Sequence, residues 1–334
     1  MKTREGLLFV TAVVALALLA PAQAVAGDKL PKPPDPTPGP LSPKPSPPGE
    51  QKQTLKLDLK GAKGGKVKVG KRVRILGTVT PWEANQQVTV TVARGKKTIK
   101  KELVLVENAG AVGEFSLRSP VLVKPGHYVA TAELAGGEAK ATSDKFKIKF
   151  PALHRGNRGK DVKIFNRVLD KQGYVPSRGR KFTQRTGRAV LAYRKVHGMA
   201  KTMRGTSGMF KTLAAGRGTY KLKKPGAGKH VEVNVGRQVM VLADNRKARR
   251  IYPVSTGKAS TPTVRGHFRF YRRQPGYNSI GMYYSVYFHR GYAIHGYRSV
   301  PARYPASHGC VRSPIPDARS IYNWVSIGMS IYVY

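Results

Sequence analysis

Alternating hydrophobic and polar positions dominate residues 55–150. The stretch "QVTVTVA" places Val88, Val90 and Val92 on one face, and "KVKVGKRVRILGTV" and "PGHYVATAEL" repeat the alternation. Because successive side chains of a β-strand point to opposite faces, this pattern indicates strands with one buried face. Short strands separated by turn sequences, such as residues 93–96, are typical of an antiparallel β-sandwich.

The hydrophobic period changes to that of a helix between residues 151 and 216. In "DVKIFNRVLDKQGY", Val162, Phe165 and Leu169 fall on one helical face, and Gly173 is a suitable stop. The stretches "TQRTGRAVLAYRKVHG" and "TSGMFKTLAAG" show the same spacing. The sequence therefore predicts a small bundle of three short helices.

Strand patterns return from residue 229 to residue 334. The stretch "HVEVNVGRQVMVLAD" alternates around a turn, and "MYYSVYFHRGYAIHGY" pairs two apolar runs across Arg290-Gly291. The stretch "PIPDARSIYNWVSIG" has helical spacing, and "SIYVY" predicts a final strand. These patterns predict a C-terminal β-rich domain with one helix, joined to the bundle by a linker at residues 217–228.

The first 54 residues differ from the rest in composition. Residues 1–26 carry basic residues at the start, an apolar run from Leu7 to Ala20 and small residues at the end, which is typical of a cleaved secretory signal. The run is shorter than the roughly 20 residues of a membrane span, so we expect no stable span after cleavage. Residues 27–54 are rich in proline and predict an extended spacer.

Charge points to an anionic environment. The chain of 334 residues has 61 lysines and arginines against 17 acidic residues, a formal net charge of +44. Such a charge implies a polyanionic partner. The basic residues are spread from Lys29 to Arg319, which favours general adhesion over a shaped groove. For a secreted protein of the cell wall or periplasm, anionic cell-wall polymers explain the charge, and no nucleic acid partner is expected.

The chain contains a single cysteine, Cys310, at the end of "HGYRSVPARYPASHGC". An exported protein with one cysteine can form an intermolecular disulfide, expose a reactive thiol or bury an inert one. A thiol attacks carbonyl groups as its thiolate, which a neighbouring histidine promotes. We expect His295, where a strand meets a loop, to reach the sulfur if that loop closes on itself.

The residues beside Cys310 suggest further roles. His308 is too close in sequence to be oriented independently, so it is expected to orient substrate or polarise the pocket. Gly309 allows close backbone approach, and the Cys310 amide with its neighbours could form an oxyanion hole. A zinc set of His289, His295, His308 and Cys310 is the competing interpretation, but the spacing fits zinc poorly, so no metal site is expected.

The stretch "IHGYRSVPARYPASHGCVR" resembles the signature of the L,D-transpeptidases, or YkuD family, and "STGKASTPTVRGHFRF" resembles its entry segment. The resemblance covers roughly residues 229–334. It implies that Cys310 is the nucleophile and that His295 accepts and returns the proton, its ring steered by a backbone carbonyl, with no cofactor. The residues implied to contact substrate or the oxyanion are His308, Gly309, Arg312, Gly296 and Ser307.

The upstream modules also carry resemblances. "LHRGNRGKDVKIFNRVLDKQGYVP" and "RTGRAVLAYRKVHG" resemble peptidoglycan-binding modules, with Arg194 in place of the usual glutamine. This module either contacts glycan or braces its neighbour. "VGKRVRILGTVTP" and "GEFSLRSPVLVKPGHYVATAEL" resemble bacterial immunoglobulin-like domains, which implies a spacer. The predicted fold is multidomain and mainly β, and we expect the C-terminal domain to fold without residues 28–216.

The YkuD resemblance implies acyl transfer on peptidoglycan stem peptides. The Cys310 thiolate would attack the amide between the third, diamino acid residue and the terminal D-alanine, giving a thioester. An amine of a neighbouring stem would then form a 3,3 cross-link. The alternatives are an L,D-carboxypeptidase that uses water on the same thioester, and a non-catalytic wall-binding protein. The complete histidine and cysteine motif argues against the last.

Overall fold

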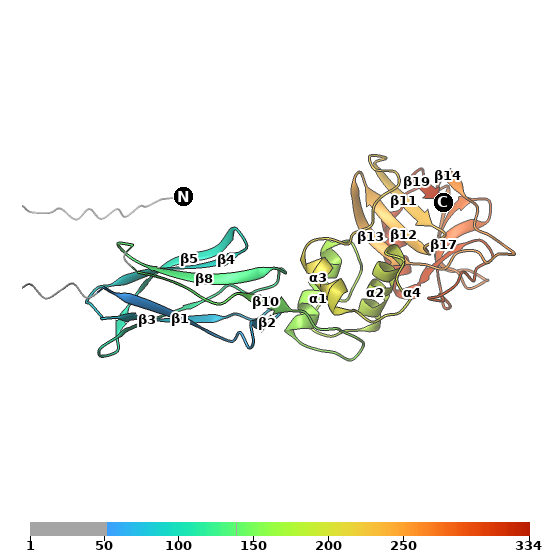
Figure 1. The fold of residues 1–334 in the computed structure, drawn as a ribbon. Coiled ribbons are helices and arrows are strands. Elements are labelled where there is room, and N and C mark those ends of the chain that lie inside the picture. Colours follow the sequence, from blue (N-terminus) through green and yellow to red (C-terminus); the bar gives the residue numbers. More distant parts are fainter. Residues whose placement is uncertain (1–51, 138) are drawn as a thin grey trace, which may run out of the picture. The chain divides into compact units, whose positions relative to one another are not determined.

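The computed structural model describes residues 52–137 and 139–334, which lie in one compact unit. The predicted secretory signal and nearly all of the proline-rich spacer lie outside the described residues. The chain is mainly β, as predicted, with a few short helices (Figure 1). Among the described residues, no helix is both long and apolar enough to cross a membrane.

The first strands form a β-sandwich of two sheets. Its strands are β1 (Thr54–Lys60), β2 (Lys66–Lys68), β3 (Arg74–Thr80), β4 (Gln87–Arg94), β5 (Lys97–Leu105), β6 (Glu107–Asn108), β7 (Gly113–Arg118), β8 (His127–Leu134), β9 (Lys140–Thr142) and β10 (Phe146–Lys149). One sheet has the order β1-β3-β7-β6, and the other has the order β2-β10-β8-β4-β5 with β9 beside β8. Figure 1 shows β1 and β3 in one layer and β4, β5 and β8 in the other.

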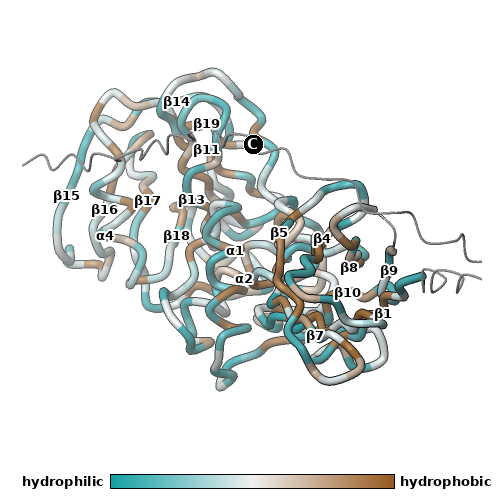
Figure 2. The backbone as a smooth tube through the Cα atoms, turned by 90° about the vertical axis from the view of Figure 1, so that its left-hand side faces the viewer, coloured by the Kyte–Doolittle hydropathy of each residue, from teal (hydrophilic) through white to brown (hydrophobic). Residues whose placement is uncertain are grey.

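The sandwich core follows from the alternation in the sequence. Val88, Val90 and Val92 of β4 are fully buried, and they pack in one cluster with Phe115 of β7. Gly77 of β3 makes room for that ring, because a Cβ there would lie 2.1 Å from Phe115 Cζ. Figure 2 shows the resulting pattern, with brown hydrophobic positions along strands such as β4 and β8.

Three helices follow the sandwich: α1 (Lys160–Lys171), α2 (Gln184–Val196) and α3 (Ser207–Ala214). We call residues 151–216 the helical module. The side chains of Thr183 and Thr206 cap α2 and α3 by accepting backbone N–H bonds, which satisfies donors that a helix leaves free. Arg194, at the position of the usual glutamine, is buried and donates to the carbonyls of Ala200 and Arg204, so it fastens the module's own loop.

Two further sheets and a helix make the C-terminal domain. The elements are β11 (Lys229–Asn234), β12 (Val239–Asp244), β13 (Lys247–Pro253), β14 (Gly266–Arg269), β15 (Arg272–Tyr277), β16 (Tyr283–His289), β17 (Tyr292–Tyr297), β18 (Val311–Pro314), α4 (Ile315–Trp324) and β19 (Ser330–Val333). The sheet orders are β13-β12-β11-β19-β14 and β15-β16-β17-β18. Val231, Met240, Ile294, Val311 and Ile321 share one core that joins both sheets and α4.

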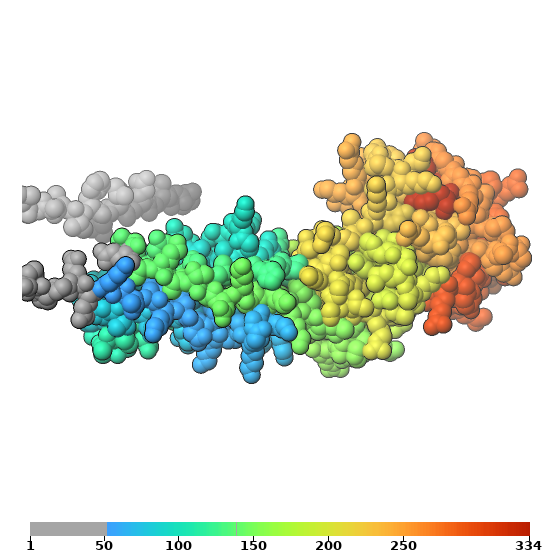
Figure 3. All heavy atoms as spheres, in the orientation of Figure 1, coloured from blue at the N-terminus to red at the C-terminus, as the bar shows by residue number. Residues whose placement is uncertain are grey.

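The helical module and the C-terminal domain also share a core. Val239, Val241 and Ile251 of β12 and β13 belong to the same buried cluster as Phe165 of α1. Residues of α2 contact those of β12 and β13. The space-filling view shows the yellow-green helical region packed against the orange C-terminal region (Figure 3). Removing the module would expose this apolar face to water, so we predict that the C-terminal domain is destabilised without the module.

Polar contacts reinforce the same junction. The N–H of Ile251 donates to the carbonyl of Gly173 at 2.8 Å. Lys195 of α2 is 3% exposed, and its Nζ donates to the carbonyls of Val254 at 3.0 Å and of Gln238 at 3.3 Å. A lysine from one module thus satisfies two backbone acceptors of the other.

Candidate active site

Cys310 and His295 lie on neighbouring parallel strands. In the register of β17 and β18, Ile294 lies opposite Val311 and His295 lies opposite Arg312, and Cys310 directly precedes β18. Ile294 and Val311 point into the core that joins both sheets, whereas Cys310 packs with Ala293 on the other face. Because side chains alternate along a strand, His295 and Arg312 share the face of Cys310. His295 lies inside β17, not at its junction with the loop as the sequence suggested.

The ring of His295 is held in one tautomer. His295 is 3% exposed, and its Nδ1 lies 3.0 Å from the carbonyl oxygen of Gly296. Because a carbonyl can only accept, Nδ1 carries the proton and Nε2 keeps its lone pair. Burial, together with the charge of Arg312, lowers the pKa of His295 to about 4, although the hydrogen bond to the Gly296 carbonyl opposes the shift. At neutral pH the ring is therefore an uncharged proton acceptor.

Cys310 is a protonated thiol at rest. It is partly buried against Met282, Tyr287 and Ala293, and its Sγ donates to the carbonyl of Gly291 at 3.7 Å. Burial raises the pKa of the Cys310 thiol, although a hydrogen bond from the Ala293 backbone and the charge of Arg312 oppose the shift. A raised pKa means that reaction with a carbonyl requires a base.

The turn before Cys310 is fixed by its own hydrogen bonds. The buried Ser307 hydroxyl accepts from the Gly309 N–H at 3.1 Å and donates to the Cys310 carbonyl. Gly309 has a φ of 114°, and a Cβ there would lie 2.4 Å from Cε1 of Tyr292. Only glycine fits this position without strain. The Gly309 N–H is already bonded to the Ser307 hydroxyl, so Gly309 contributes to the site through the backbone conformation that it allows.

A strip at residues 255–257 holds the turn from the other side. Ser255 exchanges backbone hydrogen bonds with Arg312 at 2.9 and 3.0 Å, and the carbonyl of Thr256 accepts from the Ser307 N–H at 3.0 Å. Thr263 then links the strip to the turn, because its hydroxyl accepts from the Gly257 N–H at 2.8 Å and donates to the Gly309 carbonyl at 2.7 Å. Thr263 lies in the stretch "STGKASTPTVRGHFRF", which resembles the entry segment of the YkuD family, but nothing in the sequence shows its contact with Gly309.

The aromatic ring of Tyr297 contacts both Arg312 and His295. The Arg312 guanidinium lies over the ring of Tyr297 at 4.2 Å, and the edge of His295 meets the same ring at 5.6 Å between centroids. Tyr297 was not among the predicted site residues, although its position two residues after His295 puts it on the same face of β17.

The remaining predicted residues take different places. Gly296 lets α4 pack closely, because a Cβ there would lie 2.7 Å from the Ala318 Cβ. His308 is exposed on the turn. His289 stacks at a tilt against Phe268 with centroids 4.9 Å apart. Within residues 52–137 and 139–334, no three metal-ligating side chains come together.

The strand pair, the buried histidine and the cysteine turn can be compared with known proteins. Residues 228–333 match the YkuD family model, the L,D-transpeptidase catalytic domain. This segment is a YkuD-type L,D-transpeptidase catalytic domain. No curated protein matches the chain.

Solved structures that match parts of this chain include proteins described as L,D-transpeptidases. The enzyme from Xylanimonas cellulosilytica is 27% identical with a TM-score of 0.50, over 55% of this chain and 98% of that one. The enzyme from Stackebrandtia nassauensis is 19% identical with a TM-score of 0.33, over 56% of this chain and 96% of that one. L,D-transpeptidase 1 of Mycobacterium tuberculosis is 23% identical with a TM-score of 0.26, over 32% of this chain and 61% of that one.

Proposed function

We propose that the YkuD-type domain forms 3,3 cross-links between peptidoglycan stem peptides through a thioester on Cys310. The observation that carries the proposal is the placement of Cys310 and an uncharged His295 on one face of adjacent strands. A protonated thiol and a base with a free Nε2 lone pair form the pair that nucleophilic catalysis needs. The family of the domain supports the choice of substrate.

In the proposed first step, His295 Nε2 takes the thiol proton while the sulfur attacks the amide carbon before the terminal D-alanine. The amide of Cys310 is the proposed donor to the oxygen that becomes negative. The carbon–nitrogen bond then breaks, and His295 returns the proton to the amine of the departing D-alanine. The thioester remains on Cys310.

In the second step, an amine of a neighbouring stem attacks the thioester carbon and passes its proton through His295 to the departing sulfur. Arg312 stabilises negative charge that develops on the sulfur, since its charge already opposes the raised pKa of the Cys310 thiol. His308, exposed on the turn, and the guanidinium of Arg312 are the proposed substrate contacts. Ser307, Gly309 and Gly296 keep the backbone of the site in place.

Product analysis tests the proposal. The protein is incubated with soluble disaccharide tetrapeptides, and the products are separated and sequenced by mass spectrometry. We expect 3,3-linked dimers and free D-alanine from the wild type, and neither from Cys310→Ser, because a serine hydroxyl is a much weaker nucleophile at this site. Free D-alanine without dimers would identify a carboxypeptidase. Dimers from Cys310→Ser at the wild-type rate would overturn the thioester mechanism.

We also propose that the protein acts outside the cell, in the cell wall or periplasm, and that its charge of +44 holds it to anionic wall polymers. The signal-like composition of residues 1–26 supports export. Fractionation of cells that express the tagged protein tests the location. Recovery in the cytoplasm with residues 1–26 intact would contradict it.

A further inference from the structure

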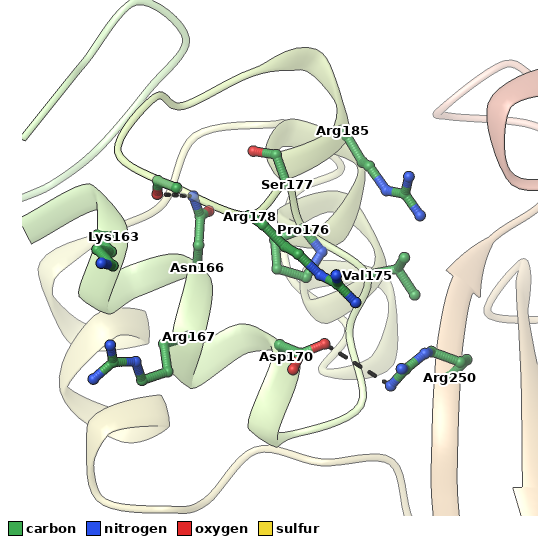
Figure 4. Close-up of a pocket in the computed structure, with 11 residues that line it drawn as sticks. Lys163, Asn166, Arg167, Asp170, Val175, Pro176, Ser177, Arg178, Arg185 and Arg250 are labelled. Atoms are coloured by element: carbon green, nitrogen blue, oxygen red, sulfur yellow. Dashed lines mark hydrogen bonds and ion pairs between the residues drawn. The ribbon is translucent and has the colours of Figure 1, made fainter.

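A polar pocket of about 650 Å³ lies where the helical module meets β13, away from Cys310 (Figure 4). Its walls come from one face of α1, the loop at residues 175–179, the first turn of α2 and the exposed edge of β13. Of the C-terminal domain, only Arg250 takes part. The module therefore forms most of the pocket, and Arg250 of β13 completes it.

The charge of this pocket is strongly positive. Its cationic residues are Lys163, Arg167, Arg178, Arg185 and Arg250. Asp170 is the one carboxylate in the lining, and its Oδ1 lies 3.8 Å from Arg250 Nη1. The side chains of this pair are 61% and 46% exposed, so the ion pair contributes little and leaves Arg250 available to another anion.

The floor of the pocket is fixed by buried hydrogen bonds. Asn166 is 3% exposed, and its Nδ2 donates to the carbonyl of Gly179 at 3.1 Å, as the dashed line in Figure 4 shows. Its Oδ1 accepts from the Thr186 hydroxyl at 2.9 Å, which also bonds to Ser177 at 2.8 Å. These bonds hold the loop that carries Arg178 before any ligand arrives, which lowers the entropic cost of binding.

Arg185 adds a donor that lacks an acceptor. Its Nη2 lies 3.5 Å from Oδ1 of Asp317, whereas its Nε is buried and has no hydrogen-bond partner among the described residues. A ligand oxygen that reached this donor would remove the cost of leaving it unsatisfied. In Figure 4, Arg178 and Arg250 extend into the space beside Val175.

We propose that this pocket binds a segment of a polymer of sugar or polyol units joined by phosphodiesters. Arginine forks match phosphate oxygens in bidentate geometry. The volume lies within the range of about 300–1,000 Å³ typical of small-molecule pockets, so it holds more than a single phosphate group. The lining has no aromatic side chain on which a nucleobase could stack, which favours such a polymer over a nucleic acid.

The sequence assigned the affinity for anionic polymers to charge spread over the whole chain. This pocket instead gathers cationic side chains in one place. It joins the module to β13, so a bound polymer would also hold the module against the YkuD-type domain by mass action. None of the pocket residues belongs to the Cys310 site. A protein that did not bind the polymer here could still carry out the proposed reaction.

The test compares two triple variants with the same net charge. The pocket variant is Arg167→Gln, Arg178→Gln and Arg250→Gln. The control variant is Lys60→Gln, Lys101→Gln and Lys145→Gln, three exposed lysines of the sandwich. A fluorescent glycerol phosphate oligomer is titrated with each protein, and binding is followed by anisotropy at low and moderate salt. Thermal unfolding midpoints verify that both variants are folded.

We expect the pocket variant to bind the oligomer at least about tenfold more weakly than wild type, because charge-assisted hydrogen bonds are lost, and the control variant to lose less than about twofold. Equal losses in both variants would show that total charge, not the pocket, governs binding. Tighter binding of polyglutamate or of an oligothymidylate with the same number of charges would also overturn the assignment. D-alanine release from soluble tetrapeptides should be equal in all three proteins.

Discussion

Lys195→Met probes the junction between the helical module and the YkuD-type domain. The wild-type ammonium group is enclosed by backbone and has two carbonyl acceptors, those of Gln238 and Val254. Burial, with a smaller contribution from the charge of Lys201, lowers the pKa of Lys195 from 10.5 to about 7. An uncharged amine still has two N–H groups, one for each carbonyl, so both bonds survive deprotonation.

The sign of the pH dependence follows from this shift. Between about pH 7 and pH 10.5 the unfolded chain holds a proton on Lys195 that the folded chain has lost, so the free energy of unfolding rises with pH. The slope is about 1.4 kcal/mol per pH unit, which gives on the order of 5 kcal/mol over the whole window. Methionine has a similar length and does not titrate, so this rise is absent from Lys195→Met.

Urea unfolding from about pH 6 to pH 9.5 measures the effect, with Lys211→Met as the control because Lys211 is an exposed lysine of α3. The difference in unfolding free energy between wild type and Lys195→Met should stay constant below pH 7. It should grow in favour of wild type by roughly 3 kcal/mol by pH 9.5. Lys211→Met should follow wild type throughout. Parallel curves for wild type and Lys195→Met would refute the buried, titrating lysine.

The remaining predictions concern the site and the shared core. His295→Ala should lower the rate of D-alanine release at least about a hundredfold and slow alkylation of Cys310. His308→Ala should lower both rates less. A larger loss in His308→Ala than in His295→Ala would mean that the base is misassigned. Burial lowers the pKa of His295 to about 4 and raises that of Cys310, so alkylation of Cys310 should speed up steadily from pH 6 to 8. An inflection near the usual histidine pKa of about 6.5 would contradict the uncharged ring. Gly309→Ala should destabilise the protein by about 2 kcal/mol or more, because it adds a clash with Tyr292 to the strained φ. Gly64→Ala, at a φ of 52° in open space, should cost less. Equal unfolding midpoints for the two variants would contradict the packing of the turn. A chain of residues 229–334 should aggregate while residues 52–334 fold, as judged by circular dichroism and gel filtration. A monomeric, folded 229–334 would contradict the shared core.

The sequence predicted elements well where a single period explains a segment. Val88, Val90 and Val92 alternate because one sheet face is buried, and Val162, Phe165 and Leu169 repeat at helical spacing for the same reason. Periodicity reports that a face is buried but not what covers it. The shared core of β12 and β13 with α1 was therefore missed.

The site was predictable only in its local part. The residues around Cys310 stand together in the sequence, and the motif quoted above joins them to His295. The register that places His295 opposite Arg312 depends on strand pairing, which no local pattern fixes. Thr263 and Lys195 act through backbone atoms far along the chain, and a buried lysine in a helix looks like an ordinary solvated position.

The central claim is that Cys310 forms a thioester with the stem peptide, and intact-mass measurement of the acyl-enzyme tests it most directly. Wild type that is mixed with a soluble tetrapeptide muropeptide and quenched early should gain the mass of the muropeptide less D-alanine, on the peptide that contains Cys310. An added amine acceptor should remove this mass and yield 3,3-linked product, and Cys310→Ala should gain nothing. Turnover by Cys310→Ala, or a wild type that stays unmodified while iodoacetamide still labels Cys310, would contradict the account.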